Sequence, residues 1–521
     1  MPVTTGDQHT LLDAYGGYAP GKTRIELTGS NQLARRFIHA PRFEWSPVPN
    51  AVRYRVALWS GAATVLDTTV ADPAVDLAGV WPGMPDGRVR MCILALDATG
   101  ALAGFSNAHS FHKVPGWNGD MAPARFPYAE TATRIMRWLA RDSGEGRYDQ
   151  GAPPYFWHAE IYNTTDSVIT TNPRAFPALH NPLGVQAFLA YARSGTDPAL
   201  RAEAMHRARA LADFTIAHST PADHRYAFLP YHTIAQGRLG LHGGHRPDLH
   251  DIVEPNKAGH MGVAYLDLFD VTGDSSYREA AARIAATLAE TQNDDGSWYY
   301  RVNSVTGATE EQYTSTGVFA LLLLDRIHRL APDARYQQAY DAILTWMLEN
   351  PVRTYRWENI FDDTAYEGPY TNQGNYDALF MGRFLLDHAS DDARFVGWAE
   401  DLFRWVDDNF VLYAEDPFMP YRAYTPTVTE QWRYYWPMDV HTANWLLFLI
   451  RLWQVTGSDG YRQRAIGAAN VVTQCQMTDG RSTTYVPDAD GGVRGHQGRD
   501  DWYGCMFLPI TALLEAAATL T

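Results

Sequence analysis

The chain has 521 residues, of which 46% are hydrophobic and 20% charged, so it carries enough apolar material for a large globular core. Its 43 basic and 59 acidic residues give a formal charge of −16, which leaves no basic surface for a phosphate backbone and argues against nucleic acid as a partner. No apolar stretch approaches the roughly 18 residues that a membrane span needs. We therefore expect neither a nucleic-acid-binding protein nor a membrane protein.

The cysteines and the N-terminus restrict cofactors and location. Cys92, Cys475 and Cys505 are too few and too scattered for a disulfide framework or a zinc site, so we expect core thiols and no bound metal. No glycine-rich phosphate-binding motif follows a strand, so no nucleotide cofactor is expected. The opening MPVTTGDQHT lacks the charged and apolar regions of a signal peptide, which predicts an intracellular protein or one whose leader was replaced by the starting Met.

The first third of the chain is predicted to contain a small β-domain. Residues 1–37 carry no clear pattern and are left unassigned. From 38 to 112 apolar and polar residues alternate with a period of two, as in RYRVALW, which predicts a β-sandwich followed by a linker at 113–124. The stretch FEWSPVPNAVRYRVALW resembles the opening strands of a fibronectin type III domain, a resemblance that implies a fold and no chemistry.

From residue 125 the apolar period changes to 3.6, and a helical hairpin repeats five times. Each repeat joins a helix that is apolar nearly all round to an Arg-rich amphipathic helix through a tight turn. The turns fall near residues 195, 273, 332, 391 and 458. Helices before the first hairpin (126–142) and after the last (503–520) raise the total to twelve. Apolar helices fit a buried inner ring and amphipathic helices an exposed outer ring, which predicts a mainly α fold, an (α/α)6 toroid over residues 125–521.

The connections between these helices differ in length on the two faces of the predicted toroid. Those on one face have two to four residues, whereas those on the other have about 20 to 37. The long connections are expected at 143–179, 219–255, 293–312, 350–371, 411–438 and 477–501. Long ordered connections in a compact domain are usually functional, and these open at the N-terminal ends of the inner helices. We therefore expect one cleft at those helix starts.

Aromatic residues are concentrated in the long connections. Sugar rings have apolar faces that stack on indole and phenol rings, so this concentration indicates a carbohydrate site. The alternative is that the same rings fix the loops to the toroid. The aromatic residues predicted to bind substrate are Trp157, Trp298, Trp357, Trp432, Tyr435 and Trp436.

Polar residues gather at the predicted starts of the inner helices. They include His180, Asn181, Glu254, Asn256, Lys257, His260, Tyr313, Asn372, Asn375, Asp377, Asp439, His441, Asn444, Asp500 and Asp501. Asn and Asp at a helix start can be caps, whereas His and Lys are not capping residues. The polar residues predicted to bind substrate are Asn181, Asn256, Lys257, Asn375 and His441.

Two reactions fit this set of polar residues. Glycoside hydrolysis needs one protonated and one ionised carboxyl group, for which Glu254, Asp439 and Asp501 are the leading candidates. Alternatives in the loops are Glu160, Glu358, Asp362 and Asp363. The alternative is β-elimination from a uronic acid, which needs a base and a neutraliser of the sugar carboxylate. The candidates are Asn181, Asn256, His260, His441 and Tyr313, with Lys257 or Arg246 for the charge. Sequence spacing does not give the distance between the carboxylates, so inverting and retaining mechanisms both stay open.

Several segments resemble the (α/α)6-toroid superfamily of carbohydrate-active enzymes. They are EPNKAGHMGVAYLDLFDVTGD, NDDGSWYY followed by EQYTSTGV, and the TGD-type hairpin turns. The resemblance implies the toroid fold and a polysaccharide or oligosaccharide substrate, because the superfamily contains glycoside hydrolases, polysaccharide lyases and uronyl C5-epimerases. The hypothesis is therefore a glycoside hydrolase; the alternatives are a polysaccharide lyase or uronyl epimerase, and a non-catalytic carbohydrate-binding protein. The oligomeric state stays open.

Overall fold

The fold is seen in a computed structural model that describes most of the chain. The described residues are 22–28, 31–32, 34–140, 162–163, 168–169, 174–175, 177–235, 238–242, 251–312, 316–358, 372–419, 421–491, 500–501 and 503–521. Contacts divide the chain into two compact units. The first unit is Met1–Asn118 with Arg404–Tyr413, and the second is Gly119–Phe403 with Ala414–Thr521.

The first unit contains two β-sheets that share one core. Its strands are β1 (Thr23–Ile25), β2 (Leu27–Thr28), β3 (Arg36–Phe37), β4 (Arg42–Trp45), β5 (Arg53–Ser60), β6 (Ala63–Val70), β7 (Ala74–Asp76), β8 (Gly87–Leu96), β9 (Leu102–Ser106) and β10 (His109–Lys113). In the larger sheet β8 pairs antiparallel with β5, β9 and β10, and β6 pairs antiparallel with β5. At the edges of this sheet, β1 pairs parallel with β9 and β3 pairs parallel with β10. The smaller sheet has the order β2-β4-β7. Three strands thus lie within the segment that the sequence left unassigned.

The second unit is helical. Its helices are α2 (Tyr128–Ala140), α3 (Pro177–Ser194), α4 (Pro198–Ala217), α5 (Pro255–Thr272), α6 (Ser275–Thr291), α7 (Val318–Leu330), α8 (Ala334–Met347), α9 (Tyr376–Asp387), α10 (Arg394–Phe410, whose last turn clusters with the first unit), α11 (Asp439–Thr456), α12 (Asp459–Gln474) and α13 (Tyr503–Thr519). The described residues therefore form twelve α-helices, and the predicted number is confirmed. Among these helices, none combines the length and apolarity required to cross a membrane.

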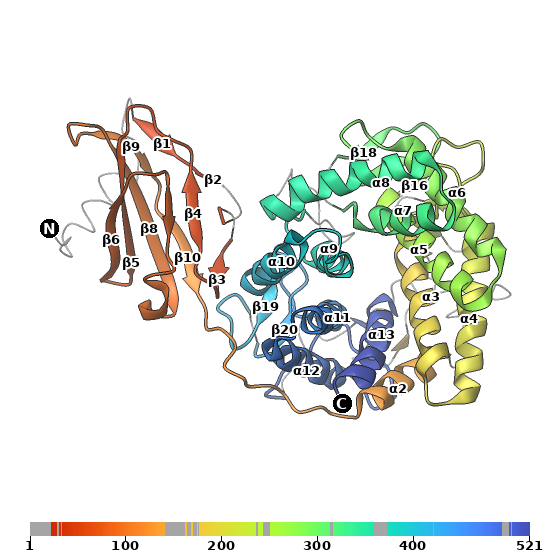
Figure 1. Ribbon diagram of the computed structural model, residues 1–521. Helices are drawn as coiled ribbons and strands as arrows, with labels where there is room; N and C mark the ends of the chain where they lie inside the picture. The colour runs from red at the N-terminus through yellow and green to blue at the C-terminus, as the bar shows by residue number, and fades with distance from the viewer. Residues whose placement is uncertain are drawn as a thin grey trace. The chain divides into compact units, whose positions relative to one another are not determined.

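The helices form two concentric rings. Helices α3, α5, α7, α9, α11 and α13 contact one another in this order, and α13 returns to contact α3, so the inner ring closes. Figure 1 shows α4, α6, α8 and α12 on the outside of this ring. Inner-helix residues such as Val185, Leu266, Leu323 and Leu446 are buried. The predicted (α/α)6 toroid is confirmed.

Short turns link each inner helix to the next outer helix on one face of the toroid. Gly273 and Gly457 end α5 and α11 with φ of 68° and 72°, a left-handed conformation that favours glycine because it lacks a Cβ. Asp197, Asp274 and Asp333 cap α4, α6 and α8 by accepting hydrogen bonds from backbone N–H groups of the first helical turn. These caps explain the TGD-type turns of the sequence.

Short strands lie in the long connections on the other face. They are β11 (Tyr162–Asn163), β12 (Val168–Ile169), β13 (Arg174–Ala175), β14 (Thr233–Ala235), β15 (Arg238–His242), β16 (Ile252–Val253), β17 (Arg301–Asn303), β18 (Thr309–Glu311), β19 (Val411–Leu412), β20 (Thr427–Val428) and β21 (Asp500–Asp501). Several join neighbouring connections: β21 pairs with β11, β13 with β14, and β16 with β17. The inner-helix starts therefore lie beneath a set of linked loops.

Candidate functional site

Asp377 lies in the first turn of the inner helix α9 and is only half-buried. Burial raises the pKa of this carboxyl to about 7; the charge of Lys257 and a hydrogen bond with Asn256 oppose the shift, and the charge of Glu254 adds to it. Near neutral pH this carboxyl is present in both its protonated and its ionised form, which suits proton transfer.

Glu254 precedes α5 and is enclosed by three basic side chains. Lys257 Nζ lies 2.7 Å from its Oε2, while Arg301 Nε and His232 Nδ1 lie 2.9 and 3.3 Å from its Oε1. Burial alone would raise the pKa of Glu254, but the charges of His232, Lys257 and Arg301 outweigh it and hold the pKa below its usual range. Glu254 has 0% exposure, so its carboxylate has no contact with solvent in this structure. Its ion pair with Lys257 is the contact through which it positions a charge near Asp377.

The start of α9 is fixed to the connection that precedes α11. Asn375 donates from Nδ2 to the carbonyl oxygens of Thr429 and Glu430 at 2.8 and 2.9 Å. Its Oδ1 lies 2.9 Å from Nδ1 of His441, a residue of α11. Burial lowers the pKa of His441 to about 3, so this imidazole is neutral near pH 7.

Tyr376, Phe380 and Arg383 occupy one face of α9 at helical spacing. The guanidinium carbon of Arg383 lies 4.1 Å from the centroid of the Phe380 ring, and its Nη2 donates to Asn444 Oδ1 at 3.3 Å. Burial raises the pKa of Tyr376, and the charges of Asp377 and Cys505 act in the same direction. Because Cys505 belongs to α13, the starts of α9 and α13 face the same region.

His260 lies on α5, one turn beyond the Glu254 cluster. Its ring stacks on that of Phe319, with centroids 3.9 Å apart and planes at 8°, and its Nε2 lies 2.9 Å from Gln186 Oε1. Burial lowers the pKa of His260 to about 3, and the charge of Arg383 adds to this effect. The imidazole is therefore neutral and held in one orientation between α3 and α7.

The other predicted catalytic residues have different placements. Asp439 begins α11, is fully buried and accepts a hydrogen bond from Ser482 Oγ at 2.8 Å. Asp501 lies in β21 before α13, and its side chain is outside the described part. Tyr313 and Trp157 lie outside the described residues. The roles assigned to these residues from sequence stay predictions.

Two predicted substrate-binding asparagines connect helices. Asn181 Nδ2 donates to Thr215 Oγ1 at 2.7 Å and ties α3 to α4. Asn256 Oδ1 accepts from the backbone N–H of Phe319 at 2.8 Å and so satisfies a donor in the first turn of α7. Both side chains are buried, and these bonds give each of them a structural role beside any contact with substrate.

The predicted aromatic residues fall into two groups. Trp298 and Trp357 are 4% and 1% exposed, and Trp298 Nε1 donates to the carbonyl of Leu288, so these rings pack the loops onto the toroid. Trp432, Tyr435 and Trp436 are half-buried, and they belong to the connection that Asn375 fixes to α9. This second group lies in a segment tied to the helix that carries Asp377.

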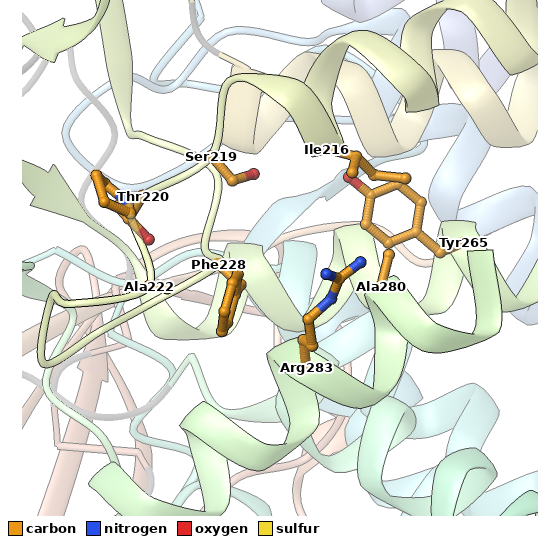
Figure 2. A pocket seen from close by; sticks show the side chains of 9 residues that line it. Ile216, Ser219, Thr220, Ala222, Phe228, Tyr265, Ala280 and Arg283 are labelled. Carbon is orange, nitrogen blue, oxygen red and sulfur yellow. The ribbon is translucent and has the colours of Figure 1, made fainter. Parts of the chain in front are cut away.

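A separate pocket of about 200 Å³ lies between the end of α4, the residues that follow it, and helices α5 and α6 (Figure 2). Its lining residues are Ile216, Ser219, Thr220, Pro221, Ala222, Phe228, Tyr265, Ala280 and Arg283. None of them is a carboxylate and none lies at the start of an inner helix, so this pocket lacks the acids that bond cleavage requires.

Five residues of the site were not selected as site residues from sequence: His232, Arg301, Tyr376, Asp377 and Arg383. Asp377 was recognised as polar at a helix start, but its type alone also fits a cap. Tyr376 and Arg383 follow the pattern of α9 and carry no separate motif. Within the described ranges, no group of three or more His, Cys, Asp or Glu residues is arranged to hold a metal ion.

Comparisons with known proteins support the fold assignment. No protein-family model matches the chain, and no curated protein matches it in sequence. A family 76 glycoside hydrolase from a bovine Bacteroides thetaiotaomicron strain is similar in structure, with a TM-score of 0.53, 10% identity, and coverage of 95% of this chain and 98% of that chain. A sugar epimerase from a ruminal bacterium has a TM-score of 0.54, 11% identity, and coverage of 75% and 98%.

A third similar structure is cellobiose 2-epimerase from Bacillus thermoamylovorans, with a TM-score of 0.53, 13% identity, and coverage of 75% of this chain and 98% of that chain. At these identities the likeness shows the fold alone. The chain therefore shares its fold with carbohydrate enzymes that include hydrolases and epimerases.

Proposed function

We propose that the helical unit is a carbohydrate-active enzyme that hydrolyses glycosidic bonds of a polysaccharide or oligosaccharide, with Asp377 as the proton donor. The observation that carries the proposal is the position of Asp377: it is an accessible acid at an inner-helix start, next to Lys257 and Asn256. The pKa of about 7 supports this role, because a leaving oxygen needs an acid that is still protonated near neutral pH.

A second carboxylate is needed to activate water or attack the anomeric carbon. Glu254 is ionised but enclosed by Lys257 and Arg301, so its proposed role is to hold Lys257 beside Asp377. Asp439 is also fully buried. We assign the second carboxylate to Asp501, which precedes α13 by two residues, and Cys505 of that helix interacts with Tyr376.

Substrate binding is assigned to the half-buried aromatics Trp432, Tyr435 and Trp436. Their segment is bonded to Asn375, immediately before α9, so a sugar stacked on these rings would lie close to Asp377. Trp298 and Trp357 have no accessible ring face and are left out of this assignment.

Proton abstraction from a sugar, as in a lyase or an epimerase, is the second candidate. The observation that favours it is the pair of neutral imidazoles, His260 and His441, whose pKa values burial lowers to about 3; the His441 ring contacts that of Tyr376, and the His260 ring contacts that of Phe380 on the same helix. Sugar epimerases and a D-mannose isomerase share the fold. A neutral base beside a tyrosine fits this chemistry better than it fits acid catalysis.

A panel of neutral and uronic-acid polysaccharides tests the proposal, with reducing ends and the ultraviolet absorbance of unsaturated uronates measured in parallel. Hydrolysis gives reducing ends alone, elimination gives both signals, and epimerisation gives neither signal but changes the sugar composition. Asp377→Asn is expected to lower hydrolysis by about 100-fold or more while the fold survives. Asp387→Asn, an exposed acid of the same helix paired with Arg451, is the matched control and is expected to keep full activity.

The pH profile provides a second check on the same residue. A proton donor works only while protonated, so the rate is expected to fall as the pH rises through about 7. Sugar binding without any turnover in the wild-type protein would refute the enzyme and favour the non-catalytic binding protein.

We further infer that the first unit is a fibronectin type III-like module. In its larger sheet β6, β5 and β8 are neighbours, and β2-β4-β7 forms the facing sheet, a two-sheet arrangement that such modules share. The unit contributes no residue to the proposed site, so we assign it a spacer or docking role.

A further inference from the structure

Arg383 is an inner-helix cation that has no ion-pair partner among the described residues. It lies on α9, is half-buried, and contacts the Phe380 ring at 4.1 Å and the amide oxygen of Asn444 at 3.3 Å. Within the described part of the chain, no carboxylate oxygen lies within ion-pair distance of its guanidinium group. Its Nε is buried and also has no hydrogen-bond partner there.

Several other cations of the inner helices are paired with acids. Lys257 is paired with Glu254, and Arg326 with both Asp267 and Asp270. Arg451 lies 2.6 Å from Asp387, which is the acid closest in sequence to Arg383 on α9. The absence of a paired acid at Arg383 is therefore a local feature and not a general property of the ring.

A partly buried charge without a counter-ion is unfavourable unless a ligand supplies one. Burial lowers the pKa of Arg383 to about 10, and the charges of Asp387, which is paired with Arg451, and of Tyr376 oppose the shift only in part. The Tyr376 hydroxyl, on the same face of the helix, is likewise buried without a hydrogen-bond partner. Two donors on one helix face thus remain unsatisfied by the described part of the protein.

We propose that Arg383 is the counter-ion for a carboxylate of the substrate, so that the site takes a uronic acid residue. This inference rests on the proposed function, because it places the sugar between Asp377 and Arg383. The two residues are six positions apart on α9, about 9 Å along the helix axis. A sugar ring bound there presents its glycosidic oxygen to Asp377 and its acid group to the guanidinium.

A carboxylate fits this position better than a phosphate. The guanidinium group matches the planar, bidentate geometry of a carboxylate, and it offers one positive charge for one negative charge. A single guanidinium charge would leave part of the charge of a phosphate dianion unpaired. The inferred substrate class is therefore a sugar acid, and sugar phosphates serve as a contrast.

Calorimetric titration of the full chain tests this inference directly. The probes are the methyl glycosides of glucuronate, galacturonate and mannuronate, their neutral hexose counterparts, and glucose 6-phosphate. At least one uronate is expected to bind tenfold or more tightly than its neutral counterpart. Arg383→Met is expected to weaken that binding by about 100-fold, the value of a charge-assisted hydrogen-bonded pair, and to leave binding of the neutral sugar unchanged.

Two further variants keep the result interpretable. Arg383→Lys keeps the positive charge but loses the planar guanidinium group with its paired N–H donors. This variant should retain part of the preference for the uronate. Arg451→Met removes a paired cation from the neighbouring helix and should keep the whole preference. A loss of preference in Arg451→Met equal to that in Arg383→Met would mean that general loosening of the ring explains the effect, and would overturn the inference.

The outcomes separate this inference from the proposed function. Equal or tighter binding of neutral sugars, tighter binding of the phosphate, or no measurable uronate binding overturns the inference. Uronate binding that depends on Arg383 but is accompanied by no turnover keeps the inference and refutes the enzyme. Asp377→Asn is expected to keep the uronate preference while losing turnover, which would support both.

Discussion

Asp377 and Glu254 belong to one neighbourhood, yet their environments move their pKa values in opposite directions. Glu254 has three basic partners within 3.3 Å, whereas the charge of Lys257 reaches Asp377 without forming an ion pair with it. The Glu254 carboxyl is therefore ionised, whereas the Asp377 carboxyl has a pKa near neutral pH. This separation of two carboxyls by environment is the pattern expected where one group transfers a proton and the other organises charge.

Glu254→Gln is expected to destabilise the protein by about 3 kcal/mol, because it leaves buried cations without their anion. Since the pKa of Glu254 is lowered in the folded state, the carboxylate stabilises the fold above its ordinary pKa of 4.5. That contribution is lost as the pH falls below this value, so the difference between wild type and variant should shrink on acidification. Urea unfolding at several pH values measures it.

Glu290→Gln is the matched control, because Glu290 and its partner Arg335 are both exposed and pairs of this kind contribute less than about 1 kcal/mol. A Glu254→Gln protein as stable as wild type but inactive would instead restore Glu254 as the catalytic acid that the sequence predicted.

At the scale of elements, the inner ring depends on close approach of its helices. Gly259 of α5 faces the backbone of Phe319 and Ala320 in α7, and a Cβ at this position would lie 2.6 Å from those backbone atoms. Backbone cannot move aside as a flexible side chain can. The glycine thus sets the spacing between the helix that carries His260 and Lys257 and its neighbour.

Gly259→Ala is expected to destabilise the toroid by about 1–3 kcal/mol, because the added methyl group forces α5 and α7 apart. A methyl group added at Gly397, in the outer helix α10, would meet no atom within 4 Å, so Gly397→Ala should stabilise the protein by up to about 1 kcal/mol through helix propensity. Thermal unfolding of both variants measures the contrast, and equal effects would contradict this account of the packing.

Sequence periodicity predicted the positions of the helices, but it did not predict the contacts between them. The repeat indicated the helix positions because the burial of one helix face is a local pattern, as in α5 and α11. Trp298 and Trp357 were predicted to bind sugar, but whether an aromatic loop residue faces solvent or the toroid depends on packing between distant segments. The proposed role of Asp377 was not predicted from sequence for the same reason: its pKa depends on α5 residues more than 100 positions away.

At the scale of the helical unit, the ring is closed by its terminal helix. Helix α13 packs against α3, where the rings of Phe507 and Phe188 meet edge to face with centroids 5.9 Å apart. Closure brings the region before α13, with Asp501, to the same face as α9. The site and the stability of the toroid therefore both depend on contacts between the two ends of this unit.

Phe507→Ala is expected to lower the free energy of unfolding by about 3–5 kcal/mol, because it leaves a cavity at the junction of the ring. Leu330→Ala, at an exposed position near the end of α7, should change it by about 0.5 kcal/mol or less. Chemical denaturation of both variants tests whether ring closure contributes to global stability; a small effect at Phe507 would mean that α13 is not part of the cooperative unit.

Local periodicity, turn residues and connection length are enough to predict the two rings of helices, the face that carries the long loops, and the polar character of the inner-helix starts. Packing between distant segments decides which of those polar residues are buried in ion pairs, as at Glu254, and which keep accessible surface, as at Asp377. The reason is physical: pKa, burial and charge pairing depend on distances between segments that the chain brings together only when the ring closes.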